Sequence, residues 1–193
     1  MTSTAPSCST TPVSGPRVVA VATSPVHGFS KDVVGSVDLL VGTGVVGDAH
    51  SGATVQHRSR VRRDPTQPNL RQVHLLHAEL LDEVAGQGYD VRPDQLGENV
   101  TTRGVDLLGL PVGTVLRLGP EAEVELTGLR NPCSQIDAFA AGLLAHMVGR
   151  DEHGRPVFKA GVMAVVRRSG AVTADAPVAV VLPPPPHRAL ARV

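Results

Sequence analysis

One of the two cysteines stands where its sulfur could react. In GLRNPCSQID, residues 128–137, Cys133 follows a proline directly and precedes Ser134. Ser134 and Asp137 have the S-x-x-D spacing of a capping box, which predicts a helix beginning just after the cysteine. The N-terminus of that helix, with Arg130 nearby, would favour a thiolate. Such a thiolate could attack an electrophile, carry sulfur or bind a soft metal ion, whereas a buried cysteine would be inert.

A glycine-rich turn and a polar strand supply further candidate side chains. His50 lies in GDAHSG, where the turn could expose its imidazole as a ligand or an acid–base group, or simply as a surface residue. In LGENVTTRG, residues 96–104, Asn99 and Thr101 could donate hydrogen bonds to the carbonyl or phosphate groups of a ligand. The alternative is that both residues line an ordinary strand edge.

The segment QHRSRVRRDP, residues 56–65, holds four arginines and a histidine. We expect a solvated loop here, Arg58–Arg63 included, although beside an anionic ligand such arginines could close over a phosphate. His74 and His77 are three residues apart in a predicted strand, so they face opposite sides and cannot easily share a metal ion. The sequence contains neither H-E-x-x-H nor C-x-x-C, so no structural zinc site is expected.

The composition predicts a globular protein that binds neither nucleic acid nor membrane. The 193 residues are 41% hydrophobic but only 2% aromatic, so Val, Leu, Ala and Ile must build the core. Basic and acidic residues number 18 each, and a chain without net charge does not attract nucleic acid or anionic lipid in general. Two cysteines make no disulfide framework, and no signal peptide or transmembrane run is evident. A cytoplasmic location is therefore expected.

Strands dominate the expected secondary structure, and only two segments have helical spacing, 77–88 and 134–149. The predicted strands lie within 17–24, 72–76, 114–119, 122–128, 160–172 and 176–183. Many strands and two helices favour a closed or nearly closed β-barrel with the helices packed outside. Residues 17–182 would form this single domain. It would lie between a disordered N-terminal tail, 1–16, which contains Cys8, and a Pro-rich C-terminal tail, 183–193.

An ordered series of segments over about residues 33–182 resembles the MOSC family, named for the C-terminal domain of molybdenum cofactor sulfurase. The segments are GVVGDAH, RQVHLLHAELLDE, LGENVTTRGVDLLGLPVGTVLRLG, AEVELTGLRNPCSQID and AGVMAVVRRSGAV. The resemblance is to the stand-alone bacterial members. It implies a mainly β fold, a MOSC-type β-barrel with a few peripheral α-helices, whose P-C cysteine lies in a cleft. That cysteine corresponds to Cys133.

In this family the cysteine either carries sulfur for the molybdenum cofactor (molybdopterin) or binds the molybdenum itself. Reductase-type members reduce N-hydroxylated compounds with electrons from partner redox proteins. The resemblance therefore implies Cys133 as metal ligand and catalytic centre, with a small molecule as substrate. Because removal of an oxygen atom needs protons, His50 is in addition a candidate proton donor. A polar ring would hold the pterin and its phosphate: Arg71, Asn99, Thr101, Arg130 and Asn131.

Two other hypotheses use the same cysteine differently. The protein could be a sulfur carrier or cofactor-delivery module with a persulfide on Cys133. Because the sequence lacks the large desulfurase domain of the eukaryotic sulfurases, a separate cysteine desulfurase would then supply the sulfur. The protein could also be a ligand-binding barrel in which Cys133 is inert. Ala49 stands where relatives often have a larger, basic residue, so contacts made by that residue elsewhere are not expected here.

Overall fold

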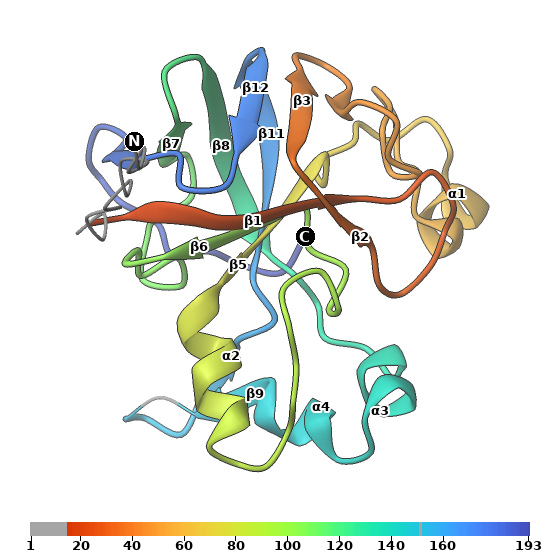
Figure 1. Cartoon of the computed structure of the whole chain (residues 1–193), viewed down its shortest axis with the longest axis vertical. Coiled ribbons are helices and arrows are strands. Elements are labelled where there is room, and N and C mark those ends of the chain that lie inside the picture. Colours follow the sequence, from red (N-terminus) through yellow and green to blue (C-terminus); the bar gives the residue numbers. More distant parts are fainter. Residues whose placement is uncertain (1–14, 151) are drawn as a thin grey trace, which may run out of the picture.

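The computed structural model describes residues 15–150 and 152–193, and β-strands make up most of its regular structure (Figure 1). The expected tail 1–16 therefore lies outside the described residues except for its last two, and Cys8 lies outside them too. Within the described part, the largest sheet has eight strands in the order β13-β7-β8-β11-β5-β6-β1-β2. In that order the strands are Val178–Val181, Val115–Leu118, Ala122–Leu129, Val162–Arg168, Val73–His77, Val100–Arg103, Arg17–Thr23 and Asp32–Val34.

The mainly β prediction is confirmed, but the large sheet does not close into a complete barrel. A barrel closes when its first and last strands pair, and here β13 and β2 remain separate edges. The start of β1 contacts the start of β13 through an isolated bridge between Arg17 and Pro177. Three hydrogen bonds of 2.9 Å support it, from Val18 N to Ala176 O, from Asp175 N to Val18 O and from Val178 N to Pro16 O, but they do not extend into a paired ladder. The sheet is therefore strongly curved and open.

Two small sheets complete the strand structure described by the model. One packs β12 (Gly170–Thr173), β3 (Ser36–Leu40) and β4 (Gly44–Val45) against the large sheet. The other pairs β9 (Val148–Arg150) with β10 (Pro156–Phe158). The predicted segment 160–172 is thus two strands, β11 and β12, and β12 pairs with β3 instead of β11.

Alternating side chains build the main core between these sheets. The burial pattern of β8 is strictly alternate, with Val124 and Leu126 fully buried, as the two-residue period predicts. β7 and β8, which correspond to the predicted strands 114–119 and 122–128, form an antiparallel hairpin in which Leu116 lies opposite Val124. The core is made of branched aliphatic residues, so the low aromatic content is consistent with the packing.

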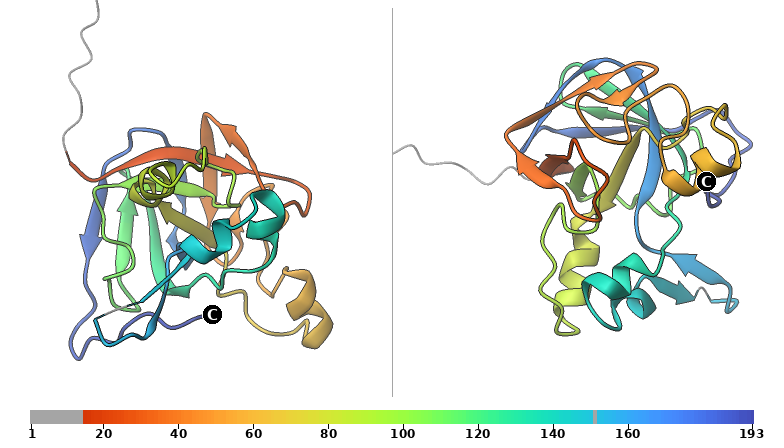
Figure 2. Two further views of the ribbon diagram at one scale, coloured as in Figure 1. Left: turned by 90° about the horizontal axis from the view of Figure 1, so that it is seen from below. Right: turned by 90° about the vertical axis from the view of Figure 1, so that its right-hand side faces the viewer.

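The described helices are short and lie outside the sheet: α1 (Arg58–Arg63), α2 (Ala78–Ala85), α3 (Gln135–Phe139) and α4 (Leu143–His146). Figures 1 and 2 show α2, α3 and α4 gathered in a lobe beside the sheet, with α1 apart from them. The helix predicted at 77–88 is confirmed as α2, which buries Leu80, Leu81 and Val84 against α3 and α4. None of the described helices has the length and hydrophobicity needed to cross a membrane.

Two sequence predictions about helices are wrong. The single helix expected at 134–149 is divided into α3 and α4, because Gly142 has a φ of 83°, outside the right-handed helical region. The apolar spacing continues across this break, since both helices face the same small core. The loop expected at Arg58–Arg63 is the helix α1, although its arginines do remain largely exposed.

The strands β5 and β6 are parallel, with Leu75 opposite Val100, and α2 connects them. This connection brings the residues just before β6 next to β5: Asn99 N donates a 2.8 Å hydrogen bond to His74 O. The segment expected as a Pro-rich tail, 183–193, runs along the domain. Leu190 in it is buried, and Val193 N donates to Leu129 O.

Candidate functional site

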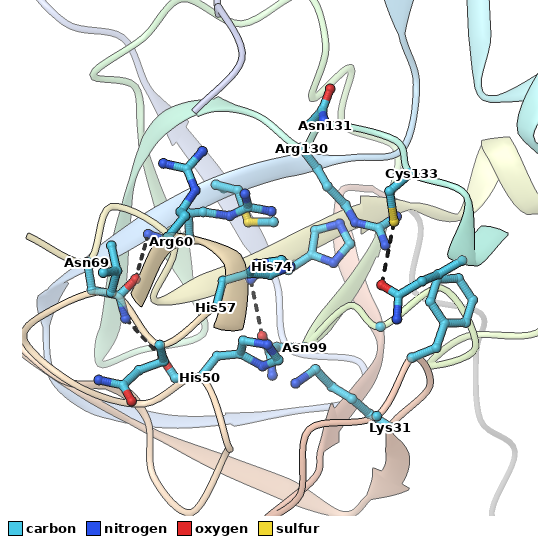
Figure 3. A pocket seen from close by; sticks show the side chains of 18 of the residues that line it. Lys31, His50, His57, Arg60, Asn69, His74, Asn99, Arg130, Asn131 and Cys133 are labelled. Atoms are coloured by element: carbon cyan, nitrogen blue, oxygen red, sulfur yellow. Dashed lines mark hydrogen bonds between the residues drawn. The ribbon is translucent and has the colours of Figure 1, made fainter. Parts of the chain in front are cut away.

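A cavity of about 410 Å³ opens beside the strand β5, between α1, the loop after β1 and the segment that carries Cys133 (Figure 3). Its walls come from six separate parts of the sequence, from Gly28 to Met163. Its polar and charged lining residues are Lys31, His50, Gln56, His57, Arg60, Asn69, Arg71, His74, Asn99, Arg130, Asn131, Cys133, Ser134 and Gln135.

Cys133 is half-buried at the cavity wall, and among the described residues it is the free cysteine. Its sulfur lies 3.5 Å from Gln135 Oε1, to which the thiol donates (Figure 3). The predicted capping box is wrong: Ser134 makes no capping hydrogen bond, and Asp137 Oδ1 instead accepts one from Leu144 N at 2.8 Å. Because α3 has only five residues, positive charge near the sulfur comes from arginines and not from a long helix.

Arg130 is the most buried of these arginines, at 8% exposure. Its backbone N–H donates to Gly161 O at 2.9 Å, and its guanidinium lies 5.9 Å from the centre of the Phe29 ring. Its Nη1 atom is buried and has no hydrogen-bond partner. Burial lowers the pKa of Arg130, while the negative charges of Cys133 and Glu98 oppose that shift. An arginine with an unsatisfied buried N–H at a cavity wall is suited to bind an anionic ligand.

Arg71 and Arg60 line the cavity with Arg130. Arg71 is held by hydrogen bonds from its backbone N to Asn69 Oδ1 at 3.0 Å and from Nη1 to Val193 O at 3.3 Å. Burial and the positive charges of Arg60 and Arg130 lower the pKa of Arg71 to about 10. Among the described residues that line the cavity none is acidic. The cavity therefore favours an anionic molecule.

Behind the lining, Asp48 is a buried anion with 2% of its side chain exposed. Its Oδ2 atom accepts hydrogen bonds from Lys31 Nζ and, at 3.0 Å, from Asn99 Nδ2. Its Oδ1 atom accepts from the backbone N of His50 at 2.9 Å and lies 3.2 Å from His50 Nδ1. Burial acts to raise the pKa of Asp48, but the hydrogen bonds from His50 and the charge of Lys31 outweigh it and hold that pKa well below its usual range.

Four histidines lie at or near the cavity. The rings of His27 and His57 lie 5.0 Å and 6.4 Å from the ring of His50, centre to centre, and burial lowers the pKa of both. His74 is buried, and its Nε2 is 2.9 Å from Ala160 O. Burial and the charge of Arg130 lower the pKa of His74 well below its usual range, so its ring is neutral. Within the described part of the chain, no three His, Cys, Asp or Glu residues are grouped as a metal site.

The structure brings six of the seven predicted site residues to the cavity. Thr101 is the exception, because it is buried and its hydroxyl donates to Glu98 Oε1 at 3.2 Å. Asn99 lines the cavity, but its amide is already bonded to Asp48, to the backbone N of His74 and to Ala22 O. The predicted residues at the cavity are His50, Arg71, Asn99, Arg130, Asn131 and Cys133.

The sequence interpretation did not identify Lys31 or His74 as site residues, and it left open whether any residue of Arg58–Arg63 reaches a ligand. The structure places Arg60 at the cavity wall, beside His57. Both belong to the basic segment 56–65, so the concentration of positive charge in that segment could have indicated that it reaches an anionic ligand. Lys31 is a single lysine without a motif around it. Lys31 reaches the cavity because the loop after β1 folds back and pairs this lysine with Asp48, which is distant in the sequence.

The fold is similar to those of solved bacterial proteins. The YuaD protein of Bacillus subtilis matches 86% of this chain and 94% of its own, with 24% identity and a TM-score of 0.71. YiiM of Escherichia coli matches 89% of this chain and 73% of its own, with 20% identity and a TM-score of 0.58. YiiM of Geobacillus stearothermophilus has 16% identity and the same TM-score, over 86% of this chain and 75% of its own.

No curated protein matches the sequence. The family model for the MOSC domain, however, matches residues 50–179, about two thirds of the chain. The matched region includes strands β5, β6, β7, β8 and β11 of the large sheet, the P-C cysteine and most of the residues that line the cavity. The chain is therefore a member of the MOSC domain family.

Proposed function

We propose that the cavity binds the molybdenum cofactor, with Cys133 as a ligand of the metal. The protein then reduces N-hydroxylated or N-oxidised small molecules, using electrons from a separate redox protein. The observation that carries the proposal is a half-buried cysteine that shares a cavity with three arginines, where none of the described lining residues is acidic. A thiolate is a soft metal ligand, and arginines bind the phosphate of an anionic pterin.

The residues at the cavity fit the cofactor in a second respect. The buried Nη1 of Arg130 has no hydrogen-bond partner in the protein, and an anionic ligand would satisfy it. Arg71, whose guanidinium has one hydrogen bond to Val193 O, has N–H groups left for the same ligand. These two arginines would hold the phosphate end. Asn131 and Arg60 lie at the wall near them and would bind the outer part of the pterin.

When bound, the cofactor would supply a metal centre that exchanges electrons and removes an oxygen atom. The protein would supply the rest of the site. Phe29 packs over Arg130 and keeps this arginine aimed at the cavity. His74, which is neutral and held by Ala160 O, adds no further positive charge. The proposed partners are an electron-donating redox protein and a small-molecule substrate, in the cytoplasm.

The decisive experiment is to measure molybdenum in protein purified anaerobically from a host that makes the cofactor. Wild-type protein should contain nearly one molybdenum per chain, and Cys133→Ala should contain almost none. Cys8→Ala is the matched control, because it removes the other thiol of the sequence and should retain the metal. The loaded protein should then reduce N-hydroxylated compounds with a chemical electron donor, and Cys133→Ala should not.

The competing hypothesis predicts a different result from the same samples. If Cys133 is a sulfur carrier, the wild type should lack molybdenum and contain sulfane sulfur, which cold cyanide would release and Cys133→Ala would lack. That result would contradict the reductase proposal. A protein with neither molybdenum nor sulfane sulfur, whose native Cys133 also resists alkylation, would contradict both and favour an inert cysteine.

A further inference from the structure

The Oδ1 atom of Asp48 is bonded twice by one residue, His50. The backbone N–H of His50 donates to it at 2.9 Å, and the ring atom Nδ1 lies 3.2 Å away. A backbone N–H can only donate, so this atom must be an acceptor. Asp48 is ionised, and an ionised carboxylate has no proton to give. Nδ1 must therefore carry the hydrogen, which makes Nε2 the unprotonated nitrogen of the neutral ring.

The other carboxylate oxygen prevents Asp48 from turning away. Oδ2 accepts from Lys31 Nζ and from Asn99 Nδ2, and Ser24 N lies 3.3 Å from it as a further donor. These donors come from the loop after β1, the segment before β6 and the end of β1. The carboxylate plane is thus fixed from three directions, and the imidazole is fixed with it.

The His50 ring is the exposed end of this arrangement. About one third of its side chain is accessible, at 32%, whereas that of Asp48 is 2% exposed. With Nδ1 turned to Asp48, Nε2 is the ring nitrogen available to the cavity that His50 lines. The charged or titratable groups around the ring are Asp48, His27, His57 and, through the carboxylate, Lys31.

We propose that Asp48 is a positioning residue that holds His50 as the Nδ1–H tautomer, so that Nε2 exchanges a proton with the substrate in the cavity. The second half of this proposal rests on the proposed function. Reduction of an N-hydroxylated amine, R–NH–OH, to R–NH₂ and water breaks the N–O bond and consumes two electrons and two protons. The redox partner supplies the electrons. His50, protonated at Nε2, gives one proton to the departing oxygen, which leaves as water, and regains it from solvent. The second proton comes from solvent and completes the amine nitrogen.

The tautomer can be measured without the cofactor, by ¹⁵N NMR of the His50 ring in the wild-type protein. The neutral ring should show a protonated Nδ1 and an unprotonated Nε2. Asp48→Asn should reverse this. Lys31 and Asn99 would take the amide oxygen of the new residue, so its NH₂ group would replace Oδ1 and lose the hydrogen bond from the His50 backbone. This NH₂ group would donate to Nδ1, and the hydrogen of the ring would then lie on Nε2. Asp82→Asn removes an exposed carboxylate bonded to Arg103 and should leave the His50 signals unchanged.

A wild-type ring protonated at Nε2, or a folded Asp48→Asn protein with an unchanged tautomer, would overturn the positioning role. The wild-type spectrum alone decides the tautomer, so the test does not depend on the stability of the variant. It also does not depend on molybdenum, so the Asp48 claim and the proposed function can fail separately.

The proton-transfer half is tested in the molybdenum-loaded enzyme. His50→Ala should retain molybdenum but lower kcat for an N-hydroxylated compound about 100-fold. Added imidazole should restore part of this rate, because it can occupy the space left by the ring; a merely structural residue would show no such rescue. His146→Ala, outside the cavity, is the control. Unchanged kcat in His50→Ala, or a loss that imidazole does not restore, would overturn proton transfer by His50.

Discussion

Arg130 and Glu98 each keep one buried polar atom without a hydrogen-bond partner, Nη1 on the arginine and Oε2 on the glutamate. Glu98 is fully buried, and its other oxygen accepts from Asp94 N at 2.9 Å and from the hydroxyl of Thr101. Burial raises the pKa of Glu98, and the charge of Arg130 opposes this only in part. The unpartnered atom of Arg130 thus lies at the wall of the cavity, whereas that of Glu98 lies in the interior of the protein.

Glu98→Gln should relieve the penalty of this buried carboxylate. The raised pKa means that the folded state holds the proton more tightly, so the stability of the wild type falls as pH rises from the ordinary carboxyl pKa of about 4.3 through the folded value. At pH 7 the variant should be at least as stable as the wild type, with a gain of about 1 kcal/mol. Urea unfolding between pH 4 and pH 7 measures this. Glu121→Gln, at an exposed position, should show no pH-dependent gain.

Asp48→Asn should lower the stability of the folded protein at pH 7, in contrast to Glu98→Gln. The pKa of Asp48 is lowered, so its stabilising effect is complete at neutral pH and is lost as pH falls below the ordinary aspartate pKa of about 3.9. Breaking its buried pair with Lys31 should cost about 3 kcal/mol at pH 7. The exposed pair of Asp82 and Arg103 should cost less than about 1 kcal/mol in Asp82→Asn. Equal costs for the two variants in urea unfolding would contradict the central role of Asp48.

Arg130→Met should separate anion binding from stability. Without a ligand, the variant loses a buried cation that neighbours Arg71, so its melting temperature should not fall by more than a few degrees, about 1 kcal/mol. Inorganic phosphate should raise the melting temperature of the cofactor-free wild type but have little effect on the variant. Arg167→Met, at an exposed arginine bonded to Glu125, should respond to phosphate as the wild type does. Equal responses in all three proteins would contradict an anion site at Arg130.

Gly161→Ala should be far more damaging than Gly154→Ala. Both glycines have positive φ, 94° and 75°, so alanine is strained at either position. A Cβ at Gly161 would also overlap Leu75 O and lie 2.8 Å from His74 Nε2, whereas a Cβ at Gly154 would meet nothing within 4 Å. We expect losses of about 3 and about 1 kcal/mol in chemical unfolding. Because Gly161 O accepts from Arg130 N, Gly161→Ala should also weaken phosphate binding.

The strands could be predicted from the sequence because burial in a sheet imposes a two-residue period that single segments display. Val124 and Leu126 alternate with glutamates in the sequence, and the structure has the strand β8 at this position. Helix ends were harder, since the spacing of apolar residues from Ile136 to Met147 continues through a break that one glycine makes. Whether the barrel closes could not be predicted from the sequence, because closure depends on the pairing of two edge strands that are far apart in the chain.

Part of the candidate site could be predicted, because some of its residues lie in segments with a distinctive local sequence. Cys133, Arg130 and His50 lie in segments with unusual local sequence, and all three line the cavity. Thr101 lies in an equally polar segment, but β6 is buried on both faces, and the Thr101 hydroxyl is bonded to Glu98 in the interior. Lys31 acquires its role only through a long-range contact with Asp48, and no local pattern reports such a contact.

Because six separate segments of the sequence form the wall of the cavity, the chain must fold before it can bind a ligand there. Phe29 and Met163 are more than a hundred residues apart in the sequence, yet both contribute to the same cavity. β11, which carries Met163, must insert between β8 and β5 before the wall is complete. A ligand that touches the whole wall can bind only after this late strand has docked. Newly made chains would therefore complete their fold as apoprotein and then bind a preassembled ligand through the opening of the cavity.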